Sequence, residues 1–293
     1  MNRSALPRIG LLGLIWGSSF LWIKLSDRGF SPVETTLGRL ALGAVVLWLV
    51  MLIRRITVPR SAKLWVHIAV AALFANAVPY LLFAVAEQSL NSSTAGIINA
   101  TTPLLTVILA LAVRHQTKLT GWQAAGLLVG FIGAVLIFAP WSIASGLASS
   151  GALECLAAAI SYAISYIYMD RFLANRGLNP IALSACQLLA ASVMLALALT
   201  VSGIRAPHFT AVSVAAVAVL GVIGTGIAYV LNYQIIASDG ATVASTVTFL
   251  PPVVAIVLGV AILDESVDGP TLAGIVLVLA GVALTRGRPA SST

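Results

Sequence analysis

Long apolar runs, separated by short polar connections, make up most of this sequence. Because a helix that crosses a membrane needs about 20 apolar residues, the runs predict ten membrane-spanning helices and no soluble domain. The predicted ranges are Arg8–Leu25, Val33–Ile53, Leu64–Ala86, Ser93–Val113, Gly121–Ala139, Gly151–Asp170, Ile181–Val201, Ala211–Ala237, Ala241–Leu263 and Thr271–Thr285. The first run could instead be a signal peptide, but no small-residue cleavage motif follows it, so we expect it to be retained. The predicted fold class is an all-α integral membrane protein.

The composition supports a membrane location. Of 293 residues, 60% are hydrophobic and only 9% are charged, and the mean hydropathy is +1.05. Ordinary soluble proteins carry about 25% charged residues. The net charge of +7 does not indicate a nucleic-acid partner, since the basic residues are scattered between the apolar runs. Cys155 and Cys186 lie inside apolar runs, so we expect no disulfide, no metal site and no cofactor.

The lysines and arginines predict the orientation, because cytoplasmic connections are enriched in both. With a cytoplasmic N-terminus, twelve of these residues fall in cytoplasmic segments and three in external ones. An even number of spans then places both termini in the cytoplasm. We expect a multi-pass protein of the cell (inner or plasma) membrane.

The two halves of the chain match at a fixed offset of 148 residues, which indicates a duplication. The offset aligns Asp27–Pro32 with Asn175–Pro180, Arg39 with Gln187, Thr94 with Thr242, Pro103 with Pro251, Gly126 with Gly274, and Gly133 with Gly281. The predicted repeats cover residues 1–140 and 149–286. Each holds five spans, so the second copy enters from the opposite side of the membrane. Inverted repeats of this kind are typical of secondary transporters, with a site near the midplane and alternating access. Ser31 and Glu34 also form the pattern of a capping box.

Polar and aromatic residues inside the predicted spans indicate a binding site. Four of them share one face of the third span, at steps of four, three and four: Asn76, Tyr80, Phe83 and Glu87. Tyr229 of the eighth span is nearly equivalent to Tyr80. Rings and amides on facing helices suit small amphiphilic molecules, although they also hold membrane helices together. The candidate substrate-binding residues are Trp16, Ser19, Asn76, Tyr80, Phe83, Asn99, Thr102, Tyr162, Tyr166, Tyr229, Asn232, Tyr233, Ser245 and Phe249.

Arg39 is the one basic residue well inside a predicted span. Glu87 and Glu154 lie near the same outer side of the membrane. These three residues could form an outer gate or a binding-site charge, or only a structural ion pair, and the arginine could instead extend to the interface. Pro79 could kink the third span and free a carbonyl group. The candidate helix kinks are Pro79, Pro103, Pro251 and Pro252.

Several motifs, in order along nearly the whole chain, resemble one transporter family. Residues 16–20 read Trp-Gly-Ser-Ser-Phe, which resembles its WGS-x-F opening. Pro251, followed by Glu265 nine residues before Gly274, resembles its P…E-(x8)-G signature. Arg39, Thr94, Pro103, Gly126 and Gly133 fit the same pattern. The chain is therefore identified as similar to the drug/metabolite transporter (DMT) superfamily, of EamA type. The resemblance implies two five-helix repeats, cytoplasmic termini and, often, export of amino acids or other metabolites. The aromatic amino-acid exporters of YddG type look most similar.

Three departures from the family pattern narrow the mechanism. Thr117 stands where the first repeat would usually carry the glutamate that matches Glu265. The middle of the first span has no glutamate, so the proton exchange of the small multidrug-resistance branch is not supported. The second half has no mid-membrane cation of the kind that anionic sugar-phosphate substrates would require. A neutral or zwitterionic solute fits better.

The leading hypothesis is a secondary transporter that exports small neutral or zwitterionic metabolites, with aromatic or hydrophobic amino acids first. Carriers of nucleobases, sugars or cationic drugs remain alternatives, as does a channel or a structural membrane protein. An enzyme is not expected, because His67, His115 and His208 lie near span ends and no hydrolase, metalloprotease or P-loop motif occurs. Without an ATP-binding motif, transport would be driven by a solute or ion gradient. The oligomeric state stays open.

Overall fold

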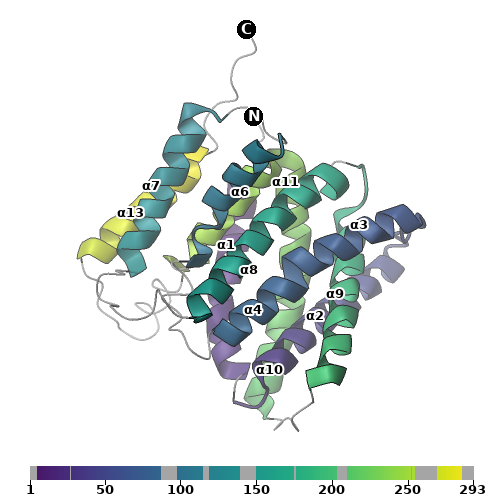
Figure 1. The fold of residues 1–293 in the computed structure, drawn as a ribbon. Coiled ribbons are helices and arrows are strands. Elements are labelled where there is room, and N and C mark those ends of the chain that lie inside the picture. Colours follow the sequence, from purple (N-terminus) through teal and green to yellow (C-terminus); the bar gives the residue numbers. More distant parts are fainter. Residues whose placement is uncertain are drawn as a thin grey trace.

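The computed structural model describes residues 5–26, 28–86, 98–114, 119–138, 150–174, 176–202, 210–251, 253–254 and 269–285, and all regular elements within these ranges are helices. The α-helices are α1 (Ala5–Ser26), α2 (Pro32–Ile53), α3 (Ala62–Ala72), α4 (Val78–Ala86), α6 (Thr102–Ala112), α7 (Gly121–Phe138), α8 (Ser150–Met169), α9 (Pro180–Ser202), α10 (Ala211–Gly221), α11 (Ala228–Ser245) and α13 (Gly269–Thr285). Three π-helices, η1 (Leu73–Ala77), η3 (Asp170–Ala174) and η4 (Val222–Ile227), and one 3₁₀-helix, η5 (Thr246–Phe249), join them. The predicted all-α class is confirmed (Figure 1).

Five helical segments of the described chain are long and apolar enough to cross a membrane. They are Pro32–Ile53, Ala62–Phe83, Ser150–Ala174, Pro180–Ala198 and Ala211–Phe249, and three shorter apolar helices accompany them: Thr102–Ala112, Gly121–Ile137 and Gly269–Thr285. Gly240 divides the longest segment, since its backbone (φ +81°, ψ 172°) lies where side chains are not tolerated. Gly240 lies between the predicted eighth and ninth spans, Ala211–Ala237 and Ala241–Leu263.

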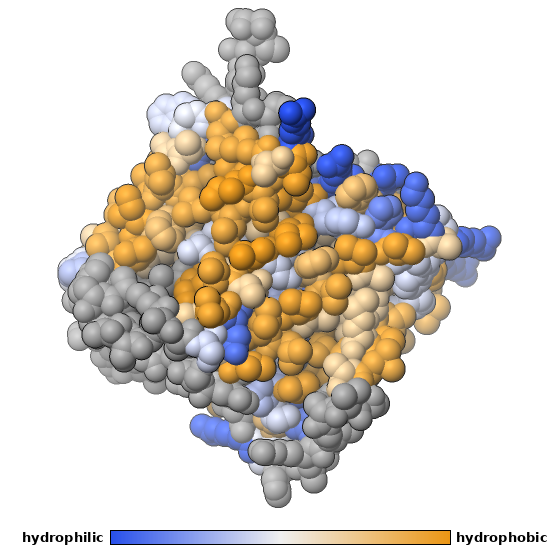
Figure 2. Space-filling view, in the orientation of Figure 1, coloured by the Kyte–Doolittle hydropathy of each residue, from blue (hydrophilic) through white to orange (hydrophobic). Residues whose placement is uncertain are grey.

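The surface and the interior differ in the size of their apolar side chains. Large side chains such as Leu52, Leu153 and Leu197 are at least 63% exposed, whereas alanines make up much of the buried core. Figure 2 shows a broad hydrophobic surface over the helices of one face, with hydrophilic side chains gathered mainly at its margins. Large side chains outside and small ones between helices are what lipid-solvated bundles require, because small residues let the backbones approach closely.

The predicted start of the second span is confirmed at atomic detail. The Ser31 hydroxyl accepts a hydrogen bond from the Glu34 N–H at 3.3 Å, and the Glu34 carboxylate accepts one from the Ser31 N–H at 2.7 Å. Pro32 occupies the first turn, where its missing N–H costs nothing. In the second repeat the Asn179 side chain accepts from the Ile181 N–H at 2.9 Å. Both repeats therefore fix where their second helix begins.

The fourth span differs from its prediction. A turn at residues 100–101 interrupts the predicted helix, and α6 begins only at Thr102. Pro103 lies in the first turn of α6, where a proline is favoured, so it starts a helix and does not kink one. The sequence predicted one continuous helix here because the residues before and after the turn are equally apolar.

The helices that end the two repeats, α7 and α13, pack side by side and run antiparallel (Figure 1). Gly126, early in α7, lies against Gly281, late in α13; Gly133, late in α7, lies against Gly274, early in α13. The repeat offset exchanges these two contacts, as a two-fold axis between the helices requires. The helices α2 and α9 pair in the same way: Gly43 approaches Leu188, and the Trp48 Nε1–H donates to the Ala185 carbonyl at 3.3 Å. Equivalent helices that meet antiparallel are the geometry of an inverted repeat.

Candidate functional site

Two π-helices occur at equivalent positions of the repeats. η1 precedes Pro79, which has no N–H for the carbonyl of Ala75. That carbonyl instead accepts a hydrogen bond from the Tyr229 hydroxyl at 2.8 Å. The equivalent η4, 149 residues later, contains Gly224 and Gly226 and no proline. Each π-helix packs against the first two helices of the other repeat: η1 on α8 and α9, η4 on α1 and α2. π-helices are frequent at functional sites because they expose backbone groups.

Arg39 projects from α2 onto η4. Its Nε–H donates to the Thr225 hydroxyl at 3.0 Å, and its Nη2–H reaches the Gly224 carbonyl at 3.5 Å. The guanidinium also lies over the ring of Tyr80, 4.7 Å from its centroid. The side chain is only 8% exposed, so it does not extend to the membrane surface. The guanidinium of Arg39 thus lies between α2 and α4 of the first repeat and contacts η4 of the second.

The equivalent contact in the other half is made by uncharged groups. Gln187, which takes the place of Arg39 in the second repeat, donates from Nε2 to the Asn76 side-chain oxygen of η1 at 2.8 Å. The offset of 149 residues that relates η1 to η4 pairs Asn76 with Thr225. The Gln187 oxygen accepts from the hydroxyl of Tyr233. Gln187 was not among the predicted site residues, although its alignment with Arg39 in the repeat was the signal that could have found it.

Aromatic rings surround this pair of contacts. The rings of Trp16 and Tyr229 meet edge to face at 6.5 Å, and Phe83 stacks on Tyr162 at 6.0 Å. Tyr80, Tyr162, Tyr166 and Tyr229 lie close enough to interact electrostatically, and Arg39 lies within the same range of Tyr162. We call these four tyrosines, with Trp16 and Phe83, the aromatic cluster. It draws on α1, α4, α8 and α11, and therefore on both repeats.

Two buried polar atoms next to the cluster have no hydrogen-bond partner among the described residues. They are Nδ2 of Asn76, a donor, and Oδ1 of Asn232, an acceptor, on side chains that are 0% and 2% exposed. An unpaired buried amide costs about 1–3 kcal/mol. Ser19 lies beside Gly224 and bonds its own helix at the Ile15 carbonyl. The structure therefore brings together Trp16, Ser19, Arg39, Asn76, Tyr80, Phe83, Tyr162, Tyr166, Tyr229, Asn232 and Tyr233.

Four other predicted site residues make their contacts elsewhere. Thr102 donates to the Asn99 side chain at 3.4 Å, and the Ser245 hydroxyl donates to the Thr242 carbonyl of its own helix at 2.8 Å. Phe249 is fully buried against Gly130 of α7. The structure places Asn99, Thr102, Ser245 and Phe249 in packing around α6, α7 and α11 rather than at the aromatic cluster.

The predicted acidic partners and the remaining prolines complete the comparison. Glu154 is half-buried on α8, and the described part of the chain shows no ion pair between it and Arg39. Glu87 and Pro252 lie outside the described residues. Pro251, a predicted kink, lies two residues after η5, where the helix changes from α to the tighter 3₁₀ form.

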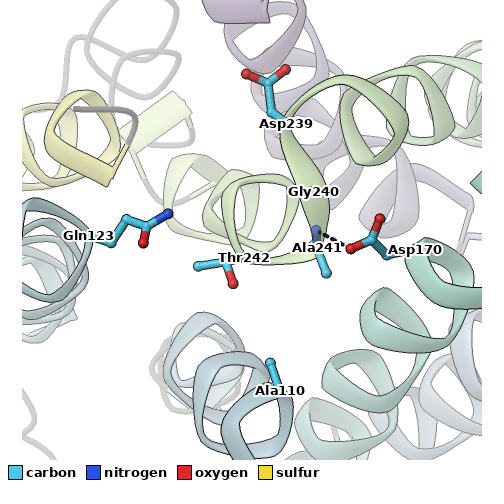
Figure 3. A pocket seen from close by; sticks show the side chains of 7 residues that line it. All are labelled: Ala110, Gln123, Asp170, Asp239, Gly240, Ala241 and Thr242. Atoms are coloured by element: carbon cyan, nitrogen blue, oxygen red, sulfur yellow. Dashed lines mark hydrogen bonds between the residues drawn. The ribbon is translucent and has the colours of Figure 1, made fainter. Parts of the chain in front are cut away.

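A separate cavity of about 230 Å³ lies where α8 ends and α7 begins. Gln123 and Thr242 face each other across it, and an oxygen of Asp170 accepts from the Ala241 N–H at 3.4 Å (Figure 3). That carboxylate caps the helix that starts after Gly240, where a negative charge is favourable. None of the residues predicted to bind substrate lines this cavity.

Comparison with known proteins agrees with this architecture. The sequence profile of the EamA-like transporter family matches twice, over residues 9–139 and 149–287. The chain is 27% identical over 292 residues to the uncharacterized inner membrane transporter YedA of Escherichia coli (strain K12), covering 98% of this chain and 93% of that one. It is 25% identical to an uncharacterized transporter of Archaeoglobus fulgidus, covering 94% and 95%. A solved crystal structure superposes with a TM-score of 0.79 over 97% of this chain and 96% of the other; at 22% identity this likeness shows the fold alone.

Proposed function

Because this chain belongs to the EamA-like transporter family, we propose that it exports small zwitterionic or neutral metabolites, with aromatic and hydrophobic amino acids as its substrates. The aromatic cluster carries this proposal. It offers rings for an apolar side chain, and beside the rings it offers a cation, an amide donor and an amide acceptor for a polar head group. Sites with this division bind small amphiphiles.

The position of the cluster supports alternating access. Its residues come from both repeats, and each π-helix is held by side chains of the other repeat. A rearrangement of one repeat against the other changes every one of these contacts. In transporters with inverted repeats such a change opens a central site to one side of the membrane at a time. We place both termini in the cytoplasm, following the distribution of lysine and arginine.

Substrate competition tests the proposal. The purified full-length protein is reconstituted into liposomes, and uptake of labelled L-phenylalanine is measured with an excess of one unlabelled competitor. We expect competition by aromatic and large aliphatic amino acids, and weak or no competition by glucose, adenine or tetraphenylphosphonium. Uptake that only nucleobases, sugars or organic cations reduce would assign a different substrate class to the same fold.

A pair of variants links the result to the cluster. Tyr80→Ala removes a ring of the cluster, whereas Trp122→Ala removes an aromatic side chain that is 57% exposed on α7. Losing one buried ring contact of about 0.5–1.5 kcal/mol, together with its apolar contact area, should raise the half-saturating phenylalanine concentration about tenfold in the first variant. The second variant should transport like the unmodified protein.

A further inference from the structure

Arg39 carries a buried charge that no acidic side chain of the described residues neutralises. Its contacts are a hydroxyl, a carbonyl at 3.5 Å and the face of one tyrosine ring. A guanidinium has five N–H donors, and the described residues accept hydrogen bonds from only two of its nitrogen atoms, Nε and Nη2. A charge in a membrane interior is costly unless a counter-charge accompanies it, and charged residues at such depth mark sites where ions or substrates bind.

The repeat shows that the charge is not needed for the structural contact. Gln187 makes the equivalent bridge from α9 to η1 with a neutral amide, and both ends of that amide are bonded, to Asn76 and to Tyr233. A glutamine at position 39 could likewise bond Thr225. The positive charge of Arg39 therefore serves something other than the packing of α2 against η4.

The groups around Arg39 define the ligand that would pair with it. Tyr80 lies next to the guanidinium, and its side chain, like that of Tyr162, is only half-buried. The unpaired Nδ2 of Asn76 lies about one helical turn before Tyr80 on the same span and offers a further donor. The unpaired Oδ1 of Asn232, on the helix of Tyr229, offers an acceptor for an ammonium group.

We propose that Arg39 binds the carboxylate of the transported solute, so that the substrates are molecules that carry a carboxylate beside an apolar group. This proposal rests on the proposed transport function, of which it specifies the substrate class. The planar guanidinium presents parallel N–H groups that match both oxygens of a carboxylate. The chain would then discriminate against amines, nucleobases and sugars by charge, and the aromatic cluster would select the side chain.

Binding to the purified full-length protein in detergent tests this without requiring transport. Three probes share one phenyl group: L-phenylalanine, 3-phenylpropionate, which lacks the amine, and phenethylamine, which lacks the carboxylate. We expect the first two to raise the melting temperature and phenethylamine to leave it unchanged. Phenethylamine that stabilises the protein as much as L-phenylalanine, or failure of both carboxylates at millimolar concentration, would overturn the proposal.

Three variants separate binding from folding. Arg39→Gln copies the residue that the second repeat uses at this position, and should weaken both carboxylates about 10- to 100-fold, since hydrogen bonds to a charged group are lost. Arg39→Lys keeps the charge but not the paired donors, and should fall between. Thr225→Val removes the structural hydrogen bond and leaves the guanidinium; it should lower the melting temperature of the free protein but keep the preference for carboxylates.

The remaining outcomes are also decisive. Arg39→Gln protein that folds and binds 3-phenylpropionate as tightly as the unmodified protein would show that Arg39 is structural. Should carboxylates bind through Arg39 while reconstituted protein moves none of them across liposomes, the carboxylate site stands and the proposed transport of amino acids fails.

Discussion

Arg39 and Gln187 show how one residue difference distinguishes two otherwise equivalent contacts. Both project from the second helix of a repeat onto a π-helix of the other repeat. Gln187 is bonded at both ends, whereas the residues that the structure describes leave some N–H donors of Arg39 without a partner. Duplication supplied the architecture twice, and the difference between Arg39 and Gln187 gives a positive charge to only one of these two contacts. In a carrier whose two repeats exchange conformations, the residues that bind the substrate can therefore belong mainly to one repeat.

The hydroxyl of Tyr229 should contribute measurably to stability. Tyr229→Phe removes the donor that satisfies the Ala75 carbonyl, and this carbonyl cannot recover a partner from Pro79. An unpaired buried acceptor costs about 1–3 kcal/mol, so the melting temperature in detergent should fall by several degrees.

Tyr168→Phe provides the matched control for this prediction. The Tyr168 hydroxyl bonds Nδ1 of His67 at 2.7 Å, but this pair is only partly buried, so solvent can replace the lost bond. We expect a clearly smaller drop in melting temperature. Equal effects of the two variants would mean that the Ala75 carbonyl finds another donor.

At the scale of the elements, close contact between α7 and α13 holds the ends of the two repeats together. A Cβ atom at Gly133 would lie 2.6 Å from the Val278 nitrogen and 2.7 Å from the Gly274 oxygen. These are backbone atoms and cannot turn aside, so Gly133→Ala must move the helices apart. We predict a loss of about 1–3 kcal/mol, read as a lower melting temperature. Gly281→Ala, at the equivalent position of α13, should behave alike, because a Cβ atom there would meet backbone atoms of Gly130 and Gly126.

Gly121 and Gly269 lie on the same two helices with open space around them. Alanine at either position should leave the melting temperature unchanged within error. If Gly121→Ala were as harmful as Gly133→Ala, close contact between α7 and α13 would not explain the loss, because alanine favours a helix more than glycine does.

The proline next to η1 should control the winding of the third span. Pro79→Ala restores an N–H that can bond the Ala75 carbonyl, which favours regular α-helix over the π segment and competes with Tyr229. We expect amino-acid uptake by proteoliposomes to fall about tenfold, because Tyr80 and Arg39 lose register. Pro103→Ala, in the first turn of α6, should leave uptake unchanged. Unaltered uptake in Pro79→Ala would contradict a functional role for η1.

Features fixed by residues that are neighbours in sequence could be predicted, whereas features fixed by contacts between separate spans could not. Ser31, Pro32 and Glu34 are neighbours, and their cap was predictable because local hydrogen bonds decide it. The face that carries Asn76, Tyr80 and Phe83 was predictable from helical spacing. The π-helices were not, since the carbonyl of Ala75 finds its partner in Tyr229, on another span. The contacts of Ser245 and Phe249 away from the aromatic cluster were not predictable, because a polar or aromatic residue on a helix shows the same sequence pattern whether it lines a site or packs against a glycine.

At the scale of the whole molecule, the distribution of charge bears on energy coupling. Among the described residues Arg39, at 8% exposed, is the only charged side chain in the buried interior, and no carboxylate is buried to the same degree. Proton-driven carriers place such carboxylates within the membrane. Uptake of L-phenylalanine down its own gradient should therefore continue when an uncoupler collapses the proton gradient. Uptake abolished by the uncoupler in sealed vesicles would require a coupling residue that this account lacks.

Exchange across a membrane tests the central claim most directly, that two inverted repeats alternate around one shared site. Liposomes containing the protein are preloaded with unlabelled L-phenylalanine or with buffer, and initial uptake of labelled L-phenylalanine is followed at increasing external concentration. An alternating carrier predicts uptake that saturates and is faster into preloaded liposomes. Uptake that rises linearly and ignores the preload would describe a channel and contradict the account.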